Sequence, residues 1–246
     1  MSPIFEVCLD SVASAVIAEA TGGSRIELCA GLMEGGITPS AGLISTVKAK
    51  TKLPIMVMIR PRGGDFCYDD DEFEAMLEDI KLCHKLKVHG VVFGVLLPDG
   101  SVDIDRTSRL VEAAKPMQVT FHRAFDMVQD PYKALEDIIS IGDIQRILTS
   151  GCERSAYEGL DTLVELSKRA QGRIIILPGA GISERNVNKI VSAMGATEVH
   201  VGAGGTKESK MKFRNPYCSM GYAISAPEYA LKVTSESKLG GMIHRF

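Results

Sequence analysis

A strand-then-helix unit recurs along this chain with a period of about 30 residues, and this repeat limits the possible folds more than any other feature. Strands that alternate with helices in this way form a parallel sheet covered by its crossover helices. Eight such strands in 246 residues indicate an α/β fold, the (β/α)₈ TIM barrel, for which about 250 residues is typical. The expected strands lie at residues 5–10, 25–29, 54–59, 91–97, 119–122, 145–149, 173–177 and 198–201.

A doubly wound open sheet is the alternative arrangement, but no GxGxxG motif follows the first strand. No linker interrupts the repeat, so we expect residues 1–246 to form a single TIM-barrel domain. Residues after about 206 should form the closing helix and a C-terminal extension. The expected helices lie at residues 11–21, 38–50, 69–87, 105–115, from 130 onwards, 158–171 and 183–194.

Charge and cysteine content restrict the class of protein. The 28 basic and 31 acidic residues give a formal net charge of −3, which argues against a non-specific nucleic-acid binder. The chain shows neither a signal peptide nor an apolar run of the roughly 20 residues that a membrane helix needs, so we expect an intracellular protein. Six thinly spread cysteines indicate reduced thiols. Those without a CxxC spacing or a strand-end position are expected to be incidental: Cys67, Cys83, Cys152 and Cys218.

Several expected strands end in polar residues, most clearly QVTFHRAFD at residues 118–126. In a TIM barrel, inward-pointing residues near the carboxyl ends of the strands line the active-site mouth. Glutamates in apolar strands are costly to bury unpaired, so they need Arg60, a histidine or a bound ligand as a partner. A buried ion-pair network that only fills the barrel is the structural alternative. The residues expected to converge at the mouth, by their period-two phase, are Glu6, Glu27, Arg60, His122 and His200.

Two cysteines share this strand-end position. Cys8 is in phase with Glu6 on the first strand, and Cys29 is in phase with Glu27 on the second. Either thiol alone is typical of core packing. Paired neighbouring strands lie about 4.8 Å apart, so two thiols at their ends could hold a soft metal between them. Thiolates select Cu(I) or zinc, and zinc would require further ligands, so a two-thiolate site favours Cu(I).

The loops after the last two strands are rich in glycine. They read PGAGI at residues 178–182 and VGAGGT at residues 201–206. Loops at these two positions of the fold commonly bind a phosphate through backbone N–H groups. The glycines could equally serve tight turns alone. The candidate anion-binding residues are Gly179, Gly181, Gly202 and Gly204.

Seven segments resemble, in this order, motifs of the CutC family of copper homeostasis proteins: EVCLDS, RIELCAGLMEGGITPS, MIRPRGGDF, TFHRAFD, LTSGC, PGAGI and MKFRN. The likeness extends over residues 5–233 and is greater to animal than to bacterial members. It implies a TIM barrel, a homotetramer, and a Cu(I)-binding protein of the cytoplasm and also the nucleus. It also implies Cys8 and Cys29 as the copper ligands.

Three functions remain open at this point. The first is a Cu(I)-binding cytoplasmic protein that acts in copper storage, trafficking or tolerance. The second is a TIM-barrel enzyme acting on a small anionic or phosphorylated metabolite at the C-terminal mouth, with His122 or a glutamate as general acid or base and Arg60 orienting the substrate. The third is an oligomeric scaffold with a vestigial pocket. Self-association is expected because the extension carries apolar residues that need cover: Met211, Phe213, Tyr217 and Met220.

Overall fold

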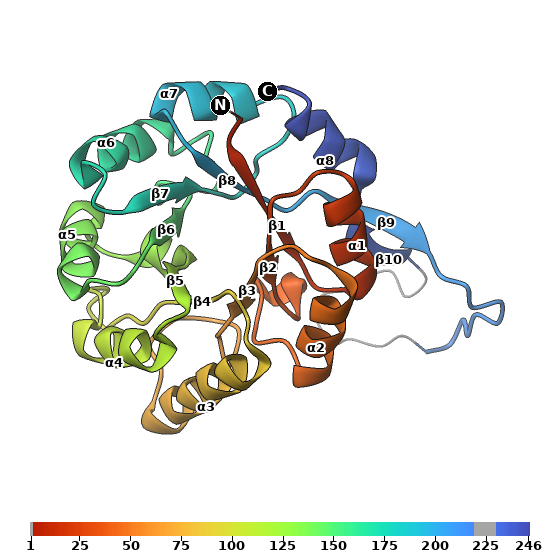
Figure 1. The fold of residues 1–246 in the computed structure, drawn as a ribbon, viewed down its shortest axis with the longest axis horizontal. Coiled ribbons are helices and arrows are strands. Elements are labelled where there is room, and N and C mark those ends of the chain that lie inside the picture. The colour runs from red at the N-terminus through yellow and green to blue at the C-terminus, as the bar shows by residue number, and fades with distance from the viewer. Residues whose placement is uncertain (1, 219–229) are drawn as a thin grey trace.

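Eight parallel strands wrap into a nearly closed barrel, and the helices that connect them form a ring around it (Figure 1). The computed structural model describes residues 2–218 and 230–246. The sheet order is β7-β6-β5-β4-β3-β2-β1-β8, and β7 and β8 at its two ends contact each other. The predicted (β/α)₈ fold is therefore confirmed. The strands are β1 (Ile4–Leu9), β2 (Arg25–Leu28), β3 (Ile55–Met58), β4 (Gly90–Phe93), β5 (Gln118–Phe121), β6 (Arg146–Thr149), β7 (Ile175–Pro178) and β8 (Glu198–Val201).

Helices cover the outer face of the barrel, and several of them begin at N-cap residues that the sequence supplies. Asp69 and Glu72 form a capping box at the start of α3, where each side chain accepts from the backbone N–H of the other. Ser11 and Asp130 are simple N-caps of α1 and α5, because their side chains accept hydrogen bonds from backbone N–H groups of the first helical turn. No helix in the described ranges is both long and apolar enough to span a membrane. The helices are α1 (Val12–Ala20), α2 (Ala41–Lys50), α3 (Asp70–Leu86), α4 (Ile104–Ala114), α5 (Pro131–Ile141), α6 (Leu160–Ala170), α7 (Val187–Met194) and α8 (Glu236–Ile243), with short 3₁₀ turns η1 (Leu32–Glu34) and η2 (Arg123–Met127).

The chain beyond β8 forms a two-stranded ribbon and then the last helix. Strands β9 (Gly204–Glu208) and β10 (Ala230–Thr234) pair antiparallel, and the ribbon projects from the ring beside α1 (Figure 1). Two hydrogen bonds donated by backbone N–H groups fix its base, from Thr234 N–H to the Ser14 side-chain Oγ at 2.9 Å and from Ser235 N–H to Ala203 O at 2.7 Å. Helix α8 follows directly and packs near α1. Residues 209–235 thus contribute a strand and no helix where they are described.

The segment after β9 carries large exposed apolar side chains. Met211, Phe213 and Tyr217 have exposed fractions of 60%, 74% and 95%. Met220, the fourth apolar residue expected there, lies outside the described residues. A single chain therefore leaves considerable apolar surface uncovered on this extension.

Candidate functional site: a thiol, carboxylate and imidazole cluster at the barrel mouth

The amino-terminal half of the barrel interior holds a closed ion-pair network. Arg25, in register with Glu6 of β1, binds both Glu6 and Glu198. Arg146 Nε lies 2.6 Å from Glu198 Oε2, so Glu198 is shared by two arginines. These four side chains are buried, and buried charges persist only when they are paired in this way. Glu6 therefore belongs to the interior of the barrel, one layer below the mouth where it was expected.

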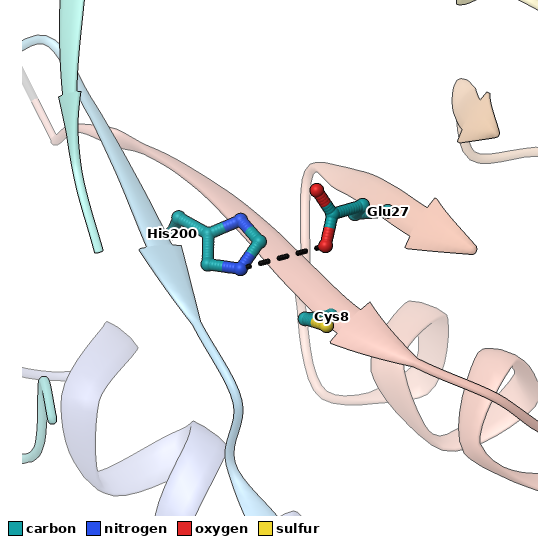
Figure 2. Close-up of side chains that lie close together, drawn as sticks. All are labelled: Cys8, Glu27 and His200. Carbon is teal, nitrogen blue, oxygen red and sulfur yellow. Dashed lines mark ion pairs between the residues drawn. The ribbon is translucent and has the colours of Figure 1, made fainter. Parts of the chain in front are cut away.

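Above this network, three chemically different side chains from adjacent strands converge. Cys8 of β1 is in register with Glu27 of β2, while His200 of β8 lies on the other side of β1 (Figure 2). The Cys8 sulfur, one carboxylate oxygen of Glu27 and one ring nitrogen of His200 all lie within 4.8 Å of one another. Glu27 and His200 are buried and Cys8 is partly exposed, so solvent reaches the cluster from the Cys8 side.

The network below orients the imidazole of His200. Its Nδ1 lies 2.9 Å from Glu6 Oε1, which leaves Nε2 directed to the cluster, 3.7 Å from Glu27 Oε2. Such a carboxylate contact on the far nitrogen is the usual way in which a metal-binding histidine is held. The other carboxylate oxygen of Glu27, Oε1, is buried and has no hydrogen-bond partner among the described residues. Buried acceptors without a partner are rare, so this atom fits a cation ligand.

The protonation states in the cluster are strongly coupled. The neighbouring Cys29 thiol, together with His200, lowers the pKa of Cys8 well below its usual value, against the effect of burial. Burial disfavours a charged His200, but Glu27 and hydrogen bonds to Cys8 and Glu6 raise its pKa well above the usual value. Burial also raises the pKa of Glu27 well above its usual value, against the attraction of His200. Burial alone would raise the pKa of Glu6, but His200 and Arg25 lower it to about 2. The cluster thus favours a Cys8 thiolate beside a protonated His200.

A cavity of about 270 Å³ opens above the cluster and contains four of the five polar residues expected at the mouth. Glu6 is absent from its wall, and so is Cys29, which is fully buried beside Glu27 with its sulfur 3.6 Å from Oε2. The lining residues used below are Cys8, Glu27, Met58, Arg60, Phe66, His122 and His200.

Arg60 has a different role from the one expected of it. Its guanidinium donates to the backbone carbonyls of Glu34, Gly36 and Gly64, and it pairs with no carboxylate among the described residues. Of the partners expected for the inward glutamates, the structure supplies a histidine: His200 contacts both Glu6 and Glu27, and Arg25 also binds Glu6. Arg60 instead anchors the loops that follow β2 and β3.

Glycines of the two glycine-rich loops line two different cavities. Gly181 and Gly202 line the mouth cavity. Gly181 and Gly204 also line a second cavity of about 510 Å³, whose other lining residues include Glu184 and Lys238. Gly179 serves packing, because a Cβ there would lie 2.5 Å from Leu148 Cδ1 inside the barrel. No arrangement of unpartnered buried side chains marks either loop as an anion site within the described ranges.

Three residues that shape this site were not expected from the sequence. Arg25 and Arg146 are the first residues of β2 and β6. Each is a charged residue in an inward phase of its strand, and this pattern could have identified it. Phe66 lies in the loop after β3 and gave no periodic signal, because loop side chains have no phase. It packs against Arg60 and His122, with the guanidinium carbon of Arg60 4.9 Å from its ring centroid.

Fold and site together define a (β/α)₈ barrel with a thiol, an imidazole and a carboxylate, which are soft, borderline and hard metal ligands, at its C-terminal mouth. The chain belongs to the CutC family, whose family model matches residues 3–205. It is 50% identical over 236 residues to the human copper homeostasis protein cutC homolog, covering 96% of this chain and 86% of that protein. It is 51% identical over 244 residues to a family protein CutC of Parabacteroides distasonis, covering 99% and 100%. The identity to this bacterial member is thus as high as the identity to the human one.

Solved structures agree with the family and the fold. The CutC structure from Streptococcus agalactiae superposes with a TM-score of 0.76 at 31% identity, covering 81% of this chain and 98% of that one. A phosphoribosylanthranilate isomerase from Thermotoga maritima superposes with a TM-score of 0.58 at 10% identity, covering 99% and 97%. At that identity the second likeness shows only the barrel fold.

Proposed function

We propose that this chain binds Cu(I) at the cluster of Cys8, Glu27 and His200, with Cys29 as a neighbouring second thiol, and acts in copper homeostasis as its relatives' names suggest. One observation carries the proposal: a thiol, an imidazole and a carboxylate lie within 4.8 Å of one another at the end of a solvent-connected cavity. A cation there would take the place of protons, because metal ligands bind in their deprotonated forms.

The surroundings of the cluster favour copper in its reduced state. Cys29, Met56, Met58 and Val92 form a small buried cluster against which Cys8 and Leu32 pack, and four of these six residues contain sulfur. Thiolate and thioether sulfur are soft ligands that select Cu(I) over harder cations. Zinc would accept the thiolate, imidazole and carboxylate but gains little from the two methionines.

The two cysteines are unequal in this arrangement. Cys8 lines the cavity, whereas Cys29 is fully buried and lies next to Glu27 and Gly36. Gly36 approaches so closely that a Cβ at this position would lie 3.1 Å from the Cys29 sulfur. Cys8 is therefore the thiol that an incoming ion meets first, and Cys29 supports it from behind.

The test is an anaerobic competition for Cu(I) against a colorimetric chelator such as bicinchoninate. We expect about one Cu(I) per chain, and a loss of affinity of about 100-fold or more in Cys8→Ser, because removing a ligand costs at least as much as removing its outer support. Cys83→Ser is the matched control, since Cys83 is a buried thiol on α3 outside the cavity. Undiminished copper affinity in a folded Cys8→Ser/Cys29→Ser double variant would reject the site. Tighter binding of Zn²⁺ than of Cu(I) would reject the assignment of Cu(I) as the bound metal.

A second function, an enzyme acting on a small anionic metabolite, shares the same mouth. The observation that favours an anion there is a pair of buried N–H donors without partners, on Arg60 and His122. Turnover would distinguish such an enzyme from a copper-binding protein that also binds the anion. We therefore treat anion binding as a separate inference.

Self-association is also part of the proposal. The exposed Met211, Phe213 and Tyr217 give the extension an apolar surface that a second copy of the chain could cover, which supports the homotetramer expected from the family resemblance.

A further inference from the structure

Two buried nitrogen atoms at the barrel mouth have no hydrogen-bond partner. They are Nε of Arg60 and Nε2 of His122, in side chains whose residues are only 5% and 3% exposed. Both residues line the mouth cavity of about 270 Å³. More than about 90% of buried polar groups in proteins are paired, so two orphan atoms in residues that line one cavity require an explanation.

The remaining polar atoms of both side chains are occupied, and their contacts fix the orphans as donors. Nη1 of Arg60 donates to the carbonyls of Glu34 and Gly36 at 2.8 and 3.0 Å, and Nη2 donates to that of Gly64 at 2.8 Å. Nδ1 of His122 accepts from the Ala124 N–H at 3.2 Å. A neutral imidazole that accepts at Nδ1 carries its proton on Nε2. Both orphan atoms are therefore N–H donors, and they belong to two residues that line the same cavity.

The setting of this donor pair is positively charged and aromatic. The ring of Phe66 packs against both members, 4.9 Å from its centroid to the Arg60 guanidinium carbon and 4.9 Å to the His122 ring centroid. Arg60 has no carboxylate partner among the described residues, so its buried charge is balanced only by carbonyl dipoles. Arg123 also lines the cavity, but its Nε lies 2.6 Å from Asp126 and is thereby neutralised.

We infer that the mouth cavity binds a small organic carboxylate, whose oxygens accept hydrogen bonds from Arg60 Nε and His122 Nε2. A carboxylate supplies two acceptor oxygens and one negative charge, which match two donors and one uncompensated arginine. A phosphate carries more negative charge, and Cys8 and Glu27 line the same cavity. This inference is independent of copper, because neither donor belongs to the metal cluster.

The test uses metal-free protein in a bis-tris chloride buffer, which contains no oxyanion. Acetate, pyruvate and inorganic phosphate are titrated by isothermal calorimetry, with ethylammonium chloride as a cationic control. We expect saturable binding of acetate or pyruvate, weaker binding of phosphate and none of ethylammonium. His122→Phe keeps the ring packing on Phe66 but removes the donor, so carboxylate affinity should fall about tenfold or more.

Thr120→Val is the matched control for that substitution. Thr120 lies on the same strand, is fully buried and also has an unpartnered hydroxyl, but it does not line the cavity. Carboxylate affinity should be unchanged in this variant. Absence of saturable carboxylate binding, equal affinity for phosphate, or full affinity in a folded His122→Phe variant would each overturn the inference.

Discussion

The buried histidine of the donor pair should give the protein a measurable loss of stability in mild acid. Burial and the nearby charge of Arg60 lower the pKa of His122 to about 3, against 6.5 for an ordinary histidine. Between these two values the unfolded chain binds a proton that the folded chain does not, so the free energy of unfolding falls as the pH falls. With these pKa values, the loss between pH 8 and pH 5 amounts to about 2 kcal/mol, and it approaches about 5 kcal/mol below pH 3.

The His122→Phe substitution isolates this contribution, because phenylalanine keeps the aromatic packing and does not titrate. Its loss of the hydrogen bond from Ala124 N–H shifts stability by the same amount at every pH. We expect the stability of the wild type relative to the variant to decrease by about 2 kcal/mol from pH 8 to pH 5. Urea denaturation across that range, in buffers without carboxylates, measures the difference. Two curves that stay parallel would refute a depressed His122 pKa.

Three further predictions concern the interior, the thiols and the extension. Glu198→Gln leaves two buried arginines without their shared carboxylate, so urea unfolding at pH 7 should show a loss of about 3 kcal/mol or more, and unchanged stability would contradict the network. In the Cu(I) competition, Cys8→Ser should lose more affinity than Cys29→Ser, whereas equal losses would indicate a symmetrical two-thiolate site. Replacing Phe213 and Tyr217 by serine should reduce the mass measured by light scattering, and an unchanged mass would exclude this surface as the interface.

The sequence was sufficient to predict the barrel because its strands are buried on both faces and its helices carry clear start signals. Boundaries were less certain. The fourth strand was expected to reach residue 97 but ends at Phe93, followed by Gly94, where a Cβ would lie only 2.7 Å from His122 Nδ1. The β9–β10 ribbon gave no signal, because GGTKE has low strand propensity and its partner strand is distant in the chain.

Period-two phase was a good guide to which strand residues face inward, but it carries no information on depth. In a barrel the stagger between strands decides which residues share a layer, and this stagger is a property of the whole closed sheet. Glu6 therefore lies one layer below Glu27, although both are the inward glutamates of neighbouring strands. For the same reason the register places Cys8 opposite Glu27, and Cys29 two residues beyond it.

That stagger also explains why one barrel can hold a rigid charged interior below and unpartnered groups above. Arg25, Glu6 and Glu198 satisfy one another in the lower layer, which leaves Glu6 a second oxygen to hold His200 at Nδ1. His200 then directs Nε2 upward, where Glu27 has an unpartnered oxygen. Among the described residues, the charged side chains of the lower layer are paired, whereas Glu27, Arg60 and His122, which line the cavity, each have a buried atom without a partner. Substitutions in the lower network should therefore act on stability first and on ligand binding through the orientation of His200.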